Sequence, residues 1–144
     1  MTDYKRVNKT RRNRGYAFEK YMVKHLNKQG NYKAVRLGSP STGLPDVLAV
    51  GGQNIITMEC KSTMNRKRLY IPKDQIIRCY NFADLFERRY YRIVLLAFKF
   101  GRTIFIKHHD DRDNIEDITC TYKGKILQGN KEIYLDDLTR EFSL

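Results

Sequence analysis

Several familiar signatures are missing from this sequence, and each absence excludes a class of protein. No run approaches the roughly 18 apolar residues of a membrane-spanning helix, and the N-terminus lacks the apolar core of a signal peptide. There is no Gly-rich phosphate loop, no G-x-S-x-G elbow and no zinc-ligand spacing. We therefore expect a soluble cytoplasmic protein, or a viral one acting inside its host, with no membrane partner and no small-molecule cofactor.

Cysteine is scarce and acidic residues are outnumbered. Cys60, Cys79 and Cys120 are odd in number and widely separated, which predicts reduced thiols in a cytoplasm-like compartment. The chain has 28 Lys and Arg against 16 Asp and Glu, a net charge of +12. So basic a balance indicates a polyanionic partner, most simply nucleic acid, although solvated basic faces would give the same composition.

At the centre of the chain, residues 43–62 form the pattern of a β-hairpin. The apolar runs 46–50 and 55–61 are separated by the turn-forming residues 51–54. With 144 residues and no internal repeat, the chain is long enough for one domain built around a sheet that contains this hairpin.

The expected register of the hairpin brings acidic side chains together. If Val50 pairs with Ile55, Asp46 lies opposite Glu59, and Lys61 follows on the same face. Like charges opposed in this way destabilise a sheet unless a divalent cation lies between them. The alternative is a pair of solvated carboxylates near strand ends.

A helix is predicted over residues 15–29, with Gly30 as its C-cap residue. Its apolar arc contains Phe18, Met22, Val23 and Leu26. Glu19 falls inside this arc, and a buried carboxylate needs a metal ion, a metal-bound water or a basic partner. The alternative is a glutamate at the edge of the arc that reaches solvent or pairs with Lys20 or Lys61.

Residues 1–14 have no apolar periodicity and are expected to form a flexible basic arm, followed by a single domain over residues 15–144. The arm residues proposed to contact DNA are Lys9, Arg11, Arg12 and Arg14. A tail that only improves solubility is the alternative.

Between the predicted helix and the hairpin, residues 32–37 read as a strand and residues 38–45 as a Gly-, Pro- and Ser-rich loop. Arg36 is a candidate partner for a phosphate or an active-site carboxylate, unless it is simply exposed. Ser39 and Ser41 could contact a phosphate or a metal-bound water, although turn chemistry alone would also select them.

Beyond Lys61 the sequence predicts a second basic cluster and a second helix, from Pro72 to about Glu87. The cluster, proposed to bind DNA, consists of Arg66, Lys67, Arg68 and Lys73. Gln75 could point back toward the site. The helix has two apolar stripes, Ile76, Tyr80 and Ala83 beside Cys79, Phe82 and Phe86. This width indicates a homodimer contact, or else a helix enclosed within the monomer.

The rest of the chain predicts further strands without chemistry. Residues 92–98 are a continuous apolar run, typical of a buried strand, and 103–107 should pair with it across Gly101. A short hairpin is expected around Gly124.

Two carboxylates and a lysine in a basic protein suit the hydrolysis of a phosphodiester. A divalent ion held by Asp46 and Glu59, with Glu19 as a third ligand, would polarise the phosphate and acidify a water molecule, while Lys61 would orient that water or stabilise the developing charge. Mg²⁺ is the expected ion because it prefers oxygen ligands and retains waters, and Mn²⁺ is expected to substitute.

These motifs resemble a known family. The P-D followed by E-x-K is similar to the restriction-endonuclease-like nucleases, and RGYAFE at residues 14–19 adds a similarity to the archaeal-type Holliday junction resolvases. The family features fall on Arg14, Gly15, Glu19, Arg36, Ser39 or Ser41, Asp46, Glu59 and Lys61. The resemblance implies an α/β, restriction-endonuclease-like fold with a mixed central β-sheet flanked by helices. It also implies a homodimer that makes paired, Mg²⁺-dependent nicks in four-way DNA junctions.

Three functions remain open from the sequence. The leading hypothesis is a metal-dependent, structure-selective endodeoxyribonuclease that resolves Holliday junctions in recombination and repair. The alternatives are a restriction- or repair-type nuclease acting on linear or flapped DNA, and a non-catalytic architectural nucleic-acid-binding protein.

Overall fold

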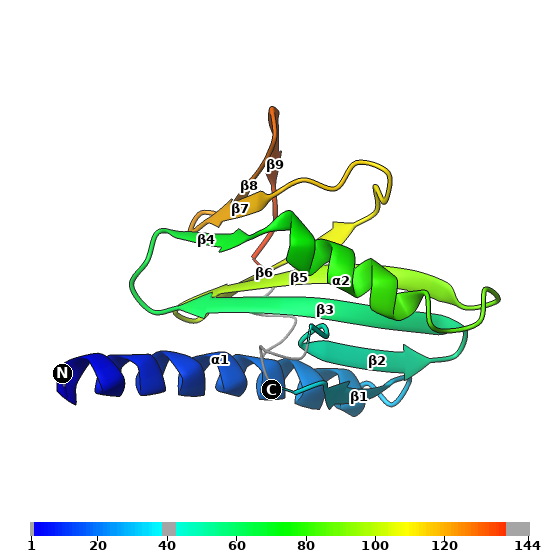
Figure 1. The fold of residues 1–144 in the computed structure, drawn as a ribbon, viewed down its shortest axis with the longest axis horizontal. Coiled ribbons are helices and arrows are strands. Elements are labelled where there is room, and N and C mark those ends of the chain that lie inside the picture. Colours follow the sequence, from blue (N-terminus) through cyan, green and yellow to red (C-terminus); the bar gives the residue numbers. More distant parts are fainter. Residues whose placement is uncertain (1, 39–42, 138–144) are drawn as a thin grey trace.

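A five-stranded mixed sheet with one helix on each face forms the centre of the molecule (Figure 1). The computed structural model describes residues 2–38 and 43–137, and only the backbone of residues 2–14. In chain order the elements are α1 Thr2–Lys28, β1 Lys33–Arg36, β2 Val47–Gly51, β3 Asn54–Thr63, β4 Arg68–Ile71, α2 Lys73–Ala83, β5 Tyr91–Phe100, β6 Thr103–His109, β7 Ile118–Thr121, β8 Lys125–Gln128 and β9 Lys131–Tyr134. The predicted α/β class with a mixed central sheet flanked by helices is confirmed.

The strand order of the central sheet is β1-β2-β3-β5-β6. Its pairs are antiparallel except β3 with β5, which run parallel. A parallel pair needs a crossover connection, and the chain supplies it through β4 and α2. The predicted antiparallel pairing of β5 with β6 across Gly101 is confirmed.

The hairpin of β2 and β3 has the predicted register. Val50 pairs with Ile55, but Gly51 and Asn54 also pair, so the turn is shorter than the four residues expected. Gly52 in this turn has a φ of 55°, a left-handed conformation that glycine adopts without strain. The sequence placed the strands correctly because the length of the turn between the two apolar runs sets their register.

The ladder between β2 and β3 ends where Val47 pairs with Met58. The remaining half of β3, residues 59–63, pairs with β5 on its other side. Within the described part of the chain, β2 does not cover this half of β3. An open sheet edge is thereby created next to the acidic residues.

Two apolar clusters lie on opposite faces of the central sheet. On one face, Phe18, Met22 and Leu26 of α1 pack on β1, β2 and β3. The predicted apolar arc of this helix is confirmed. The helix ends at Lys28, and Gly30 has a φ of 74°, as expected for a C-cap glycine.

The start of α1 differs from the prediction. The helix begins at Thr2 and not at residue 15, so the backbone of residues 2–14 is helical, while the flexibility of the basic arm stays a prediction. In Figure 1 the first turns of α1 extend past the end of β3. A helix that does not pack on a sheet needs no apolar face, and Lys and Arg are good helix formers, so the missing periodicity was a poor guide.

On the other face, α2 packs against β5 and the second sheet. The helix ends at Ala83, four residues before the predicted end, because Asp84 forms its C-cap. Its buried residues are Ile76, Cys79, Tyr80 and Ala83. Both apolar stripes thus contribute to the core of the monomer, and the width of this helix does not require a dimer.

The second sheet has the strand order β4-β7-β8-β9, and its buried residues Leu69, Ile71, Ile118 and Ile126 join the α2 cluster. The hairpin predicted around Gly124 is confirmed as β7 and β8, and β9 extends it. Neither helix in the described ranges is both long enough and apolar enough to cross a membrane.

Two glycines predict opposite effects on stability. A Cβ added at Gly51 would lie against the carbonyl oxygen of Asn31 and the ring of Tyr32, whereas a Cβ at Gly15, inside α1, meets nothing within 4 Å. We expect Gly51→Ala to lower the free energy of unfolding by about 1–3 kcal/mol through overpacking. Gly15→Ala should raise it by about 0.5–1 kcal/mol, because alanine favours the helix. Urea unfolding measures both, and equal effects would contradict this packing.

Candidate active site

A cleft of about 280 Å³ opens at the uncovered edge of β3, between the two helices. It is lined by Gly15, Tyr16, Glu19, Leu44, Asp46, Glu59, Cys60, Lys61, Asp74, Gln75 and Arg78. The structure therefore brings together the four residues predicted to be catalytic in its described part, Glu19, Asp46, Glu59 and Lys61. Because α1 and α2 lie on opposite faces of the sheet, both can reach the cleft only at this edge.

Asp46 continues the hairpin toward Glu59, as the register predicted. Its backbone N–H donates to the carbonyl oxygen of Met58 at 3.1 Å. The N–H of Cys60 donates to Oδ2 of Asp46 at 2.8 Å. These two hydrogen bonds to β3 thus fix both the backbone and the carboxylate of Asp46. A solvated residue at a strand end would not require them.

Glu59 is almost completely buried, at 1% exposure. Burial, and then the carboxylate of Asp46, raise the pKa of Glu59 to about 9. The nearest cation is Arg78, whose Nη2 lies 3.9 Å from Oε1 of Glu59. Within the described part of the chain, that Oε1 has no hydrogen-bond partner. A buried acceptor of this kind is costly unless something else binds it.

Glu19 is buried as the helical pattern predicted, and its basic partner is Arg36. Nε of Arg36 donates to Oε2 of Glu19 at 3.0 Å, and the guanidinium lies 4.6 Å from the ring centre of Tyr16. Burial and Asp46 raise the pKa of Glu19 to about 7, although Arg36 opposes them. Of the sequence alternatives for Arg36, the contact with a site carboxylate is the one observed.

The oxygen atoms of the cleft fit a hard divalent ion. Oε1 of Gln75, like Oε1 of Glu59, is a buried acceptor without a hydrogen-bond partner among the described residues. Both residues line the same cleft as Asp46. Oxygen donors of this type suit Mg²⁺ or Mn²⁺ better than softer metals.

The role of Glu19 as a third carboxylate ligand stays a prediction. In residues 15–38 and 43–137, no group of three or more His, Cys, Asp or Glu side chains is arranged to hold a metal ion. Arg36 binds Glu19 and would compete with a metal for its oxygen atoms. Asp46 and Glu59 remain as the carboxylate pair beside the open edge of β3.

The other predicted residues lie in different places. Gln75 lines the cleft, as expected. Arg66, Lys67, Arg68 and Lys73 are exposed and do not line it, and Lys73 uses its backbone N–H to bind Asp117 at 2.7 Å. Ser39 and Ser41 lie outside the described residues, as do the side chains of Lys9, Arg11, Arg12 and Arg14. Their roles stay predictions.

Arg78 and Tyr16 belong to the site but were not predicted from the sequence. Arg78 follows Gln75 by three positions, so the two share one face of α2. Tyr16 precedes Glu19 by the same interval on α1. The helical spacing from a residue already assigned to the site could have identified both.

The raised pKa values predict that rising pH destabilises the metal-free protein. The native state keeps protons that an unfolded glutamate, with a pKa near 4.5, has released. The stabilising contribution is complete below about pH 4.5 and is lost as the pH rises toward about 7 for Glu19 and about 9 for Glu59. Glu59→Gln cannot ionise, so its free energy of unfolding should depend less on pH.

The measurement is urea unfolding across this pH range without divalent ions. Glu87→Gln, whose side chain is 71% exposed, is the matched control and should follow the wild type. If the Glu59→Gln and wild-type profiles ran parallel, the buried protonated carboxyl would be disproved.

Comparisons with known proteins identify the family of this chain. The family model "Archaeal holliday junction resolvase (hjc)" matches residues 10–142. The chain is 29% identical over 88 residues to the crossover junction endodeoxyribonuclease Hje of Sulfolobus acidocaldarius, a match that covers 59% of this chain and 62% of that relative. The chain thus spans less than two thirds of that relative's length.

Among solved structures, the fold is similar to that of Hjc from Archaeoglobus fulgidus, a Holliday junction resolvase. The TM-score is 0.55 at 18% identity, over 76% of this chain and 84% of that one. This likeness shows the fold alone. The family match covers nearly the whole sequence and includes every element that builds the cleft, so the chain belongs to the archaeal Holliday junction resolvase family.

Proposed function

We propose that this protein is a metal-dependent, structure-selective endonuclease that resolves four-way DNA junctions by paired nicks. The observation that carries the proposal is the convergence of the half-buried Asp46 and Lys61 with the buried Glu59 at an open sheet edge. A net charge of +12 supports an anionic polymer as the substrate. Membership of the family supports branched DNA as its form.

In this mechanism Asp46 and Glu59 would hold Mg²⁺, or Mn²⁺ in its place, with Oε1 of Gln75 as a further donor. The ion would supply Lewis acidity toward the scissile phosphodiester. Lys61 would stabilise the negative charge that develops on the phosphate. Glu19, with a pKa near 7, is suited to accept a proton near neutral pH. To accept a proton, Glu19 must first be released from its ion pair with Arg36.

The remaining assignments belong to the proposal as well. Ser39 and Ser41 would act on a phosphate or on water at the cleft. The DNA contacts would include the basic residues of α1, Lys9, Arg11, Arg12 and Arg14, and those around β4, Arg66, Lys67, Arg68 and Lys73. Arg36 and Gln75 would contact DNA close to the cleft.

Asp46→Asn tests the catalytic site. We expect this variant to lose cleavage of a synthetic four-way junction by about 10²-fold or more, because the substitution removes charge that the transition state requires. Junction binding should be kept or strengthened, since a negative charge near the phosphate is gone. The measurement is single-turnover cleavage beside binding without divalent ions. Asp111→Asn, an exposed residue outside the cleft, is the control.

The same experiment separates the alternatives. Equal or faster cutting of linear duplex or flapped DNA would indicate a restriction- or repair-type nuclease, and unchanged activity in Asp46→Asn would indicate an architectural protein. A second readout does not depend on cleavage. Mg²⁺ should raise the Tm of the wild type and not that of Asp46→Asn, because a ligand stabilises only the state that binds it.

A homodimer is also part of the proposal. It is supported by an exposed apolar surface and not by the width of α2. The outer side of α2 and the turn after it expose Ile77 at 38% and Leu85 at 78%, beside the half-buried rings of Phe82 and Phe86. An apolar strip of this kind is suited to pack against its copy about a two-fold axis.

Light scattering tests this contact. We expect a dimeric mass for the wild type and a monomeric mass for Ile77→Lys with Leu85→Lys, because the added charges would face each other across the interface. Tyr134→Lys, at another exposed apolar position, should remain dimeric. A wild-type monomer at micromolar concentration would reject the homodimer.

A further inference from the structure

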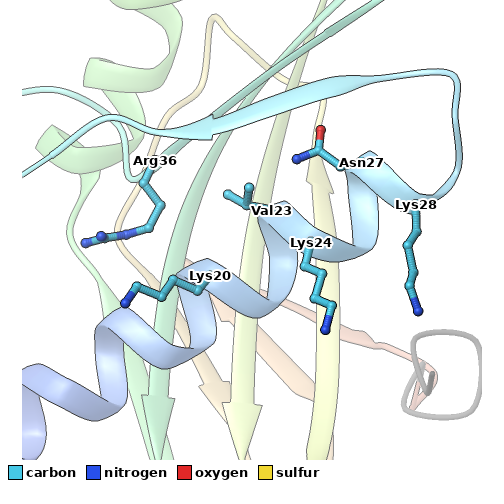
Figure 2. A pocket seen from close by; sticks show the side chains of 6 residues that line it. All are labelled: Lys20, Val23, Lys24, Asn27, Lys28 and Arg36. Atoms are coloured by element: carbon cyan, nitrogen blue, oxygen red, sulfur yellow. The ribbon is translucent and has the colours of Figure 1, made fainter.

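A second hollow lies along α1, and none of the residues predicted to bind DNA, apart from Arg36, belongs to it. Its volume is about 440 Å³, and it is lined by Lys20, Val23, Lys24, Asn27, Lys28 and Arg36. Figure 2 shows Val23 and Asn27 between the helix and β1, with the amino groups of Lys24 and Lys28 pointing to the same side. In this part of the described chain the lining contains four cations and no acidic residue. We call it the α1 groove.

The three lysines follow one another at intervals of four residues. Residues at this spacing lie above one another on one helix face, and like charges there destabilise a helix. Lys28 has a structural justification because it lies in the last turn, where a cation favours the helix dipole. Lys20 and Lys24 lie further from the helix end and gain no such stabilisation from the dipole. A row that costs stability in this way is relieved when an anion binds.

The groove is already formed in the free protein. Asn27 holds β1 against the helix through two hydrogen bonds, from its Nδ2 to the carbonyl oxygen of Ala34 at 3.2 Å and from the N–H of Ala34 to its Oδ1 at 2.7 Å. The two walls are thereby fixed, so a ligand would not have to order them.

Arg36 connects the groove to the cleft. It lines the groove, and its Nε donates to Glu19 of the cleft at 3.0 Å. An anionic chain whose reacting phosphate lies at Asp46 could therefore pass Arg36 and continue along the lysine row without leaving the positively charged surface.

We propose that the α1 groove binds the sugar-phosphate backbone of the duplex arm next to the scissile phosphate. This inference rests on the proposed function, since it names where part of the junction lies. At a rise of about 1.5 Å per residue, successive lysines from Lys20 to Lys28 are about 6 Å apart, which is on the order of the distance between neighbouring phosphates along one DNA strand. The row of lysines, together with Arg36, therefore matches three to four consecutive phosphates, more than a small anion would occupy.

Lys24→Gln with Lys28→Gln tests the groove, because both residues lie outside the cleft and keep its chemistry intact. Binding to a four-way junction is measured by fluorescence anisotropy over a salt series without divalent ions. We expect weaker binding, and a slope of log affinity against log salt that is shallower by about 2 for each protomer that contacts the DNA, since two phosphate contacts per protomer are lost. The Tm should change little, because the relief of repulsion between the lysines offsets the loss of the Lys28 charge from the last turn of the helix.

Lys123→Gln with Lys131→Gln is the charge-matched control. Both lysines are exposed in the second sheet, which packs on the α2 face of the central sheet. The control should keep a slope within about 0.5 of the wild type. An unchanged slope in the Lys24 and Lys28 variant, or equal losses in both variants, would overturn the inference. Wild-type protein that does not bind the junction at all would reject the proposed function itself.

Neutral methylphosphonate linkages locate the contact. Placed one at a time along each arm, they should weaken wild-type binding over three to four consecutive positions on one side of the cut and have no effect there on the Lys24 and Lys28 variant. If the lysines contact these phosphates directly, neutralising the phosphate and removing the lysine do not have additive effects, so the variant is insensitive to the linkage. If the same positions affect both proteins equally, the backbone does not lie in the α1 groove.

Discussion

A buried carboxylate held close to a half-buried one is the constraint on which this structure depends. Burial, and then the carboxylate of Asp46, raise the pKa of both Glu19 and Glu59, so the protein holds these acids where their charged form is disfavoured. Each glutamate has one arginine nearby, Arg36 from β1 and Arg78 from α2. Neither arginine neutralises the whole group, and Oε1 of Glu59 keeps an unused acceptor. A positively charged ligand would thus relieve the unfavourable electrostatics of the site.

This arrangement arises because β2 is shorter than β3. Because β2 begins at Val47, the second half of β3 extends past it and leaves its edge open. Asp46 bonds to this edge through Met58 and Cys60, while α1 and α2 reach it from opposite faces. The apolar clusters on both faces hold the helices in position, so the packing of the core also sets the geometry of the cleft.

Positive charge surrounds these acids and extends away from them. Arg36 binds Glu19 and also lines the α1 groove, so one side chain belongs to the acidic cleft and to the basic surface. A phosphate that bound Arg36 would compete with Glu19 for the same donors. In the proposed function, substrate binding at Arg36 and the release of Glu19 are therefore linked.

The sequence alone determined the hairpin and its register, because two short apolar runs joined by a Gly-rich turn leave few ways to pair β2 with β3. It also determined that Glu19 faces the interior, since helical spacing places it among Phe18 and Met22. Only the tertiary structure decided the partner of Glu19, since Arg36 lies on a strand 17 residues away and no local pattern selects it. The burial of the wide face of α2 depended likewise on the second sheet, whose strands β7 and β8 come from the far end of the chain. Local periodicity records which face of an element is apolar, but what covers that face is set by contacts between distant segments.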